Sequence, residues 1–100
     1  RDSLQTLRTR LKDLAALYAE TVEKVVATKD NDYIDFQARR MVEMAGHIIM
    51  SHLLILDTER NDSFRTSAEV YIRYADAEVR KNAAFIASFD INDMTYYRRD

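Results

Sequence analysis

Apolar residues recur at three- and four-residue steps through most of the chain, which is the spacing of one face of an α-helix. In the first stretch the repeating positions are Leu4, Leu7, Leu11, Leu14, Tyr18, Val22 and Val25. Because each residue of a helix turns by about 100°, these positions form a single stripe, with polar residues on the opposite side. The pattern predicts a long amphipathic helix over residues 2–29.

The second stretch predicts a central helix over residues 33–57. Val42, Ile49 and Leu56 broaden its apolar stripe on one side and Met44 broadens it on the other. The stripe itself follows alternating four- and three-residue steps, and it consists of Ile34, Ala38, Met41, Ala45, Ile48, His52 and Ile55.

A third helix is predicted over residues 63–88, and a weaker segment over 90–97 is either a short final helix or a docked tail. Asn and Asp residues at 30–32 and 61–62 favour turns and helix caps, so they separate the three helices. Long helices joined by such short breaks run antiparallel to their neighbours. We therefore predict an all-α fold in one domain over residues 1–100: an antiparallel up-down-up bundle of three long helices with a short C-terminal helix or tail. The stripe of the third helix is Phe64, Ala68, Tyr71, Ile72, Ala75, Val79 and Ile86.

The composition supports long helices and excludes several functions. The chain has no proline and one glycine, the two residues that interrupt helices most. It has no cysteine, which excludes disulfides and thiolate chemistry, and its net charge of −2 with mixed signs argues against nucleic-acid binding. No apolar run approaches the roughly 20 residues of a membrane-spanning helix. We expect a cytoplasmic protein and, since the chain begins at Arg1 rather than Met, a fragment of a longer one.

The two histidines, His47 and His52, lie five residues apart, so they point about 140° away from one another on a helix. They cannot chelate one ion from one helix face. We expect His52 to project into the core as a buried neutral imidazole bonded to a polar neighbour. His47 projects to the back of the helix, where Glu43 precedes it by one turn. No catalytic residue and no metal site is predicted.

Gly46 lies in the middle of the central helix, where glycine is unfavourable unless another group must approach closely. Together with Ala45 it forms a notch of small residues. By the register of the helices, Tyr18 and either Tyr71 or Tyr74 pass near it. We therefore predict that the notch receives a tyrosine ring and that leucine at position 46 would overpack it.

Asn82 falls on the apolar stripe of the third helix, level with about Gln37 of the second. The two side chains are either a buried polar pair that fixes the register of the helices or are exposed near the end of the bundle.

The back of the central helix is unexpectedly apolar. Phe36, Met50 and Leu54 fall within a narrow arc opposite the predicted core stripe, interleaved with Glu43 and His47. A further partner would explain this face: the C-terminal tail, a second subunit or the missing part of a longer chain. The alternative is that these are scattered exposed apolar residues. These five residues are the predicted interface.

Two sequences within residues 40–86 carry a resemblance to a known family: RMVEMAGHIIMSHLLILD and SFRTSAEVYIRYADAEVRKNAAFI. They resemble the C-terminal helical domain of a group of bacterial acyl-CoA dehydrogenases, which carry an extra helical module after the catalytic domains. The resemblance covers about half of the chain, over the second and third predicted helices, and extends less closely over the first. It lies in the overall pattern, especially VEMAGHIIM and SAEVYIRYADAEV, and includes no catalytic signature.

The resemblance implies a parent enzyme that uses FAD to oxidise an acyl-CoA thioester and passes electrons to an electron-transfer flavoprotein. The flavin site and the catalytic glutamate would belong to upstream catalytic domains, so no cofactor is expected in this chain. The role left for this module is assembly: packing on those domains, completing a subunit interface or covering an active-site entrance. We favour packing and homo-oligomerisation through the back of the second helix, with the chain itself non-catalytic. The alternative is an autonomous helical bundle that binds an unrelated protein partner.

Overall fold

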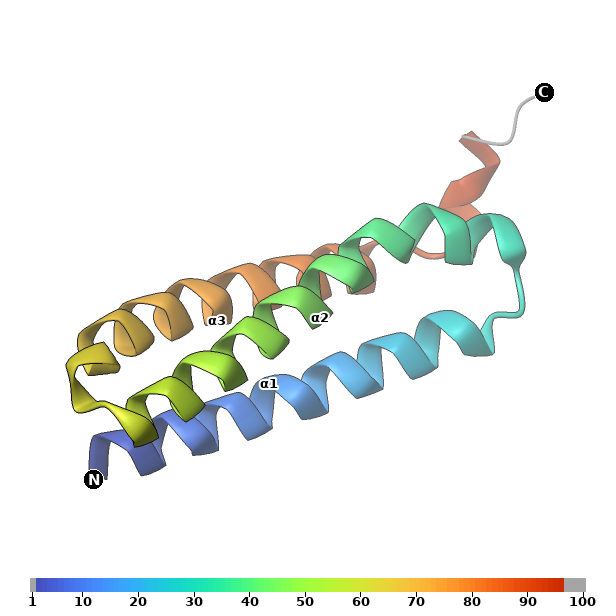
Figure 1. The fold of residues 1–100 in the computed structure, drawn as a ribbon. Helices are drawn as coiled ribbons and strands as arrows, with labels where there is room; N and C mark the ends of the chain where they lie inside the picture. Colours follow the sequence, from blue (N-terminus) through green and yellow to red (C-terminus); the bar gives the residue numbers. More distant parts are fainter. Residues whose placement is uncertain (1, 97–100) are drawn as a thin grey trace.

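The computed structural model describes residues 2–96, which form three long α-helices and two short 3-10 helices. Figure 1 shows the long helices side by side, with α2 running antiparallel to α1 and α3. The bundle is a rod with extents of 54 × 19 × 17 Å. No strand occurs among residues 2–96, so the predicted all-α helical bundle is confirmed. The elements are α1 (Asp2–Ala27), α2 (Asn31–Arg60), η1 (Asp62–Phe64), α3 (Arg65–Ser88) and η2 (Ile91–Tyr96).

The turn between α1 and α2 is held by side chains that bond to the backbone. The hydroxyl of Thr28 donates to the carbonyl of Val25 over 2.7 Å, and a carboxylate oxygen of Asp30 accepts from the backbone N–H of Tyr33 over 3.1 Å. Lys29 lies between them with a φ of 55°, in the left-handed region. Because Asp30 is the cap, α2 begins at Asn31, two residues before the predicted start.

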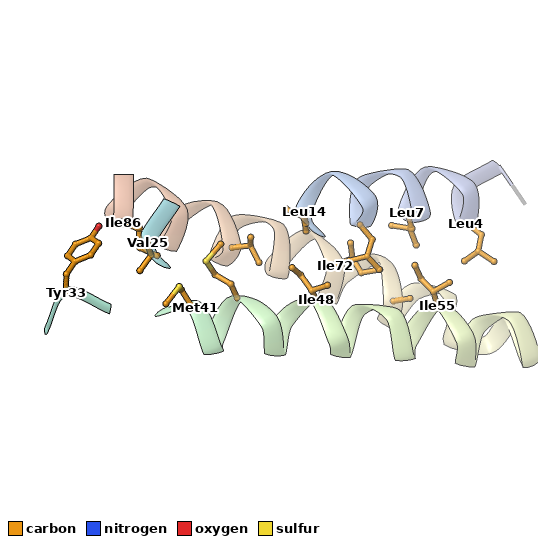
Figure 2. Close-up of a cluster of buried hydrophobic side chains, with 14 of the residues drawn as sticks. Leu4, Leu7, Leu14, Val25, Tyr33, Met41, Ile48, Ile55, Ile72 and Ile86 are labelled. Atoms are coloured by element: carbon orange, nitrogen blue, oxygen red, sulfur yellow. The ribbon is translucent and has the colours of Figure 1, made fainter. Parts of the chain in front are cut away.

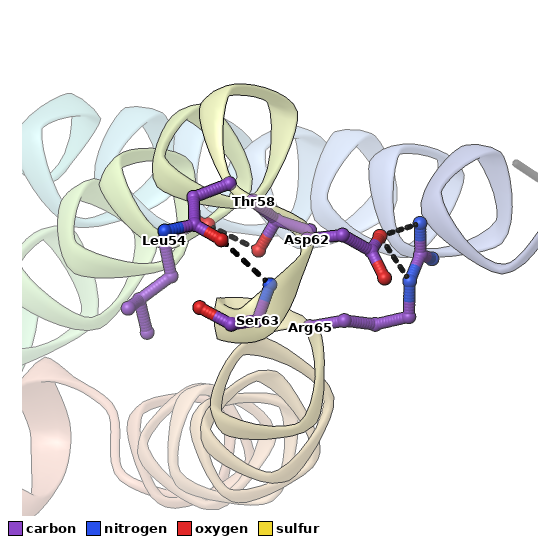
Figure 3. A network of polar contacts seen from close by, with 6 residues as sticks. Leu54, Thr58, Asp62, Ser63 and Arg65 are labelled. Carbon is purple, nitrogen blue, oxygen red and sulfur yellow. Dashed lines mark hydrogen bonds and ion pairs between the residues drawn. The ribbon is translucent and has the colours of Figure 1, made fainter.

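The turn between α2 and α3 has its own network (Figure 3). The hydroxyl of Thr58 donates to the carbonyl of Leu54 over 2.9 Å, and the side chain of Asn61 accepts from the N–H of Ser63. Arg65 pairs with Asp62 at 2.7 Å. With Asn61 as the cap, α2 extends to Arg60 and η1 precedes α3.

The core runs along the axis of the bundle and receives side chains from all three helices (Figure 2). Each buried Leu, Ile or Met side chain contributes about 1.5–3 kcal/mol relative to an exposed one. The α1 stripe is buried over most of its length, as the spacing predicts. The buried apolar residues of α2 and α3 are Tyr33, Met41, Met44, Ile48, Ile55, Ala68, Ile72, Ala75, Val79 and Ile86.

The buried face of α2 is rotated from the predicted one by roughly 60°, at the 100° per residue of a helix. Ser51 is fully buried and His52 is exposed, so the prediction of a buried His52 is wrong. The small hydroxyl of Ser51 can enter the core because it donates to the carbonyl of His47 on its own helix, over 2.7 Å. An imidazole at that position would have no such local partner. The same rotation exposes Val42 and Ile49, which the sequence placed beside the core.

The C-terminal segment docks against the start of α2. The hydroxyl of Tyr33 donates to the carbonyl of Phe89 over 2.8 Å, and the ring of Phe36 stacks on that of Phe89 with centroids 4.7 Å apart. Met94 of η2 is buried. Asp90 caps η2 by accepting from the N–H of Asn92 over 2.9 Å. Residue 97, the last of the predicted segment, lies outside the described residues.

Candidate functional site

The predicted interface on α2 divides into buried and exposed parts. Phe36 and Leu54 are half-buried and pack against the core, and His47 is half-buried as well. Glu43 and Met50 are exposed. Phe36 and His47 face α3, because α3 occupies the side of α2 that the sequence assigned to the back.

His47 lies in a small aromatic cluster with two tyrosines of α3. Its Nδ1 atom is 3.0 Å from the hydroxyl of Tyr71, and its ring meets Tyr74 edge-on with centroids 5.5 Å apart. Burial raises the pKa of Tyr71, and the neighbouring Tyr74 raises it further. This cluster packs α2 against α3. Its groups capable of acid–base chemistry are the imidazole of His47 and the two tyrosine hydroxyls.

A second aromatic cluster lies at the same interface, near the start of α2. The guanidinium of Arg40 lies over the ring of Phe85 at 4.2 Å and over that of Phe36 at 4.9 Å. Arg40 also donates to the carbonyl of Phe36 over 2.9 Å. Phe36 and Phe85 therefore pack with the bundle's own residues.

The surface of α2 that no other helix covers carries an exposed apolar stripe. Its side chains are strongly exposed: Val42 by 69%, Ile49 by 59%, Leu53 by 49% and Leu56 by 50%. Gly46 lies on the same surface, between Val42 and Ile49. We call these five residues, Val42, Gly46, Ile49, Leu53 and Leu56, the outer stripe. Their steps of four, three, four and three residues are visible in the sequence as a second helical repeat.

Gly46 does not form the predicted notch for a tyrosine ring. A Cβ atom added at Gly46 would meet no atom within 4 Å, among the residues that the structure describes. Tyr18 is half-buried and packs against the edge of the core, and Tyr71 contacts His47 instead. Ala45, also half-buried, adjoins an open surface at Gly46. The prediction was wrong because the rotation of α2 turns Gly46 away from the bundle.

The sequence left two alternatives for a pair of amides at the α2–α3 interface, burial or exposure. Gln37 and Asn82 are both buried, so the alternative of exposure at the bundle end does not hold. Among the described residues, Oε1 of Gln37 and Nδ2 of Asn82 have no hydrogen-bond partner. One is an acceptor and the other a donor, so the two groups are chemically complementary.

The groove between α1 and α2 has a volume of about 580 Å³, and its wall includes His52 and the ion pair of Arg8 with Glu59. Within residues 2–96 no three His, Cys, Asp or Glu side chains are grouped to hold a metal. In the same range, no helix combines the length and hydropathy that crossing a membrane requires.

The fold and surface define a helical-bundle module with an apolar stripe on α2 that its own helices leave uncovered. The sequence matches the family model "Acyl-CoA dehydrogenase C terminal" over residues 1–94. The fold is similar to the crystal structure of an acyl-CoA dehydrogenase family protein from Porphyromonas gingivalis, with a TM-score of 0.84 and 39% sequence identity. That match covers 90% of this chain and 78% of the other. No curated protein matches the sequence significantly. The chain belongs to the family of acyl-CoA dehydrogenase C-terminal domains, and the resemblance seen in its sequence is confirmed.

Proposed function

We propose that the chain is a non-catalytic C-terminal module of an FAD-dependent acyl-CoA dehydrogenase and that it serves the packing and oligomerisation of that enzyme. The observation that carries the proposal is the outer stripe. Apolar side chains at Val42, Ile49 and Leu53 face away from the bundle, and Leu56, at the rim of the α1–α2 groove, is 50% exposed. Burial of these side chains against a partner would be favourable. The proposed assembly surface of α2 is therefore the outer stripe, which the bundle leaves uncovered, and not the predicted interface.

The chemistry of the proposed parent enzyme belongs to its upstream catalytic domains. There FAD would accept a hydride from an acyl-CoA thioester, and an electron-transfer flavoprotein would receive the electrons in the cytoplasm. The carboxylates of this chain are poor candidates for the base. Glu78 pairs with Lys81 at 2.9 Å, and Glu43 is exposed on the surface of α2. The proposed role of the module is therefore to position and join catalytic subunits.

The experiment uses the whole dehydrogenase that carries this module, with Leu53→Glu as the variant. A charge in the outer stripe opposes burial of that stripe without touching the core. Val70→Glu is the matched control, since Val70 is 65% exposed on α3, away from the outer stripe. Flavin per subunit and oxidation of acyl-CoA by an artificial acceptor are measured together with the thermal midpoint.

We expect Leu53→Glu to lower the thermal midpoint while each subunit retains its flavin, and Val70→Glu to change neither. Stoichiometric binding of FAD by the 100-residue chain alone would contradict the proposal, because it would place the cofactor site within the bundle. An unchanged midpoint in the Leu53→Glu enzyme would contradict it as well.

A further inference from the structure

The outer stripe has the spacing of a coiled-coil seam. In a heptad repeat the apolar a and d positions alternate by four and three residues, and they face a partner helix. The outer stripe follows this alternation over Val42–Leu56, and Arg39 continues it at one end and Arg60 at the other. Asp35 extends it one step further. The core of the bundle lies on the opposite side of α2, so the seam is open along its length.

We propose that α2 pairs through the outer stripe with α2 of a second copy of this chain, in antiparallel orientation. The proposal rests on the assembly function and names its partner and geometry. It follows from three properties of the seam: its apolar centre, the glycine at its middle and the signs of the charges at its two ends.

The apolar centre of the seam is complementary to that of a second copy in one antiparallel register. In an antiparallel pair the a positions of one helix lie opposite the d positions of the other. Gly46 then lies opposite the partner's Ile49, and Val42 opposite the partner's Leu53. Because Gly46 has open space where a Cβ would be, it can receive the larger side chain across the two-fold axis. An isologous contact of this kind closes as a dimer.

The charges at the ends of the seam select the antiparallel orientation. In the same register Asp35 of one copy lies opposite the partner's Arg60, so opposite charges meet at both ends. A parallel pair would place Asp35, Arg39 and Arg60 each against its own copy, and like charges opposite one another are unfavourable. Charge complementarity thus indicates a second copy as the partner, because the two ends of one seam complement each other.

The first test is the mass of the 100-residue chain in sedimentation velocity over a series of concentrations. We expect a concentration-dependent dimer, with the dissociation constant raised at least about tenfold by Leu53→Glu and unchanged by Val70→Glu. Asp35→Arg should raise it about fivefold, as two attractive pairs become repulsive. The double variant Asp35→Arg/Arg60→Asp should restore the original value. A wild-type chain that stays monomeric, or a double variant that fails to recover, would overturn the proposal.

The second test determines the orientation by disulfide cross-linking. Because the chain has no cysteine, any cross-link must involve the introduced residues. Val42→Cys and Leu53→Cys are prepared separately and then mixed under oxidising exchange conditions. In the antiparallel pair, position 42 lies opposite position 53, whereas two cysteines at position 42 are about 16 Å apart along the axis. That separation exceeds the reach of a disulfide.

We expect the mixture to cross-link and each single variant to remain unlinked. Cross-linking of Val42→Cys with itself would indicate a parallel pair and overturn the proposal. The two proposals fail separately. If the chain is monomeric while Leu53→Glu still alters the whole dehydrogenase, self-pairing is rejected and the assembly function stands. If the chain dimerises while Leu53→Glu leaves the whole dehydrogenase unchanged, the assembly function is rejected instead.

Discussion

The Nδ1 atom of His47 lies 3.0 Å from the hydroxyl oxygen of Tyr71, and this contact joins the middle of α2 to α3. It gives the histidine a structural partner inside the bundle. It is also consistent with the rotation of α2, in which His47 faces α3 while Gly46 and Leu53 face outward. The contact therefore links the packing of the bundle to the exposure of the outer stripe.

A double-mutant cycle of His47→Ala and Tyr71→Phe measures this contact. A hydrogen bond within a protein contributes about 0.5–1.5 kcal/mol to stability, so the two substitutions should be non-additive by that amount. Urea unfolding of the four proteins at neutral pH and low concentration gives the coupling energy. Additive effects would show that the two side chains stabilise the bundle independently.

Stability should fall at alkaline pH partly through Tyr71. Burial and the nearby Tyr74 raise the pKa of Tyr71, so the folded state holds its phenolic proton more tightly than the unfolded state. The unfolded chain releases that proton from about pH 10 upward, the ordinary pKa of tyrosine. The stabilisation is therefore complete below pH 10 and is lost as the pH rises through the folded pKa.

Urea unfolding of wild type and Tyr71→Phe between pH 8 and pH 11 checks this prediction. The free energy of unfolding of the wild type should fall more steeply above pH 10 than that of Tyr71→Phe. Parallel pH curves for the two proteins would contradict it.

Gly46→Ala should stabilise the monomeric bundle. Alanine at a helix-interior glycine stabilises by about 0.4–1 kcal/mol where the new Cβ meets no obstacle, and none lies within 4 Å of this one. Thermal unfolding of the two proteins at concentrations below association gives the difference. A destabilised Gly46→Ala variant would show that position 46 is crowded in the folded monomer.

Gln37→Met should be tolerated although Gln37 is fully buried. Its Oε1 atom has no hydrogen-bond partner among the described residues, and its Nε2 atom donates to the Tyr33 hydroxyl over a long 3.5 Å. An apolar side chain of similar volume removes the unsatisfied acceptor, so we expect a change within about 1 kcal/mol or a gain. Met44→Ala, which opens a cavity in the same core, should cost about 2–5 kcal/mol. A loss above about 2 kcal/mol in Gln37→Met would indicate that the amide is satisfied.

The sequence predicts the helices better than it predicts their faces. The absence of proline and the caps near Asp30 and Asn61 are local signals, and they place the three helices within a few residues. The rotation of α2 is not a local property, because this helix is apolar on two sides. Ile48 and Ile49 are equally apolar, and only packing against α1 and α3 decides which of them is buried.

The same ambiguity explains the errors at the candidate site. His52 falls on the apolar repeat in the sequence, yet it is exposed. Ser51 is polar and lies off that repeat, yet it is buried, because its hydroxyl donates to the carbonyl of His47. With α2 rotated in this way, Gly46 lies at the surface and Phe36 packs against Phe89. The second helical repeat of the outer stripe was present in the sequence, but its exposure could be found only from the fold.

The mass of the whole dehydrogenase in solution shows whether the outer stripe joins its subunits. Light scattering compares wild type with Leu53→Glu and with the control Val70→Glu at equal concentrations. If the outer stripe is the assembly surface, Leu53→Glu has fewer subunits per particle and the control keeps the wild-type mass. A Leu53→Glu enzyme with the same mass as the wild type would contradict an assembly role of the outer stripe.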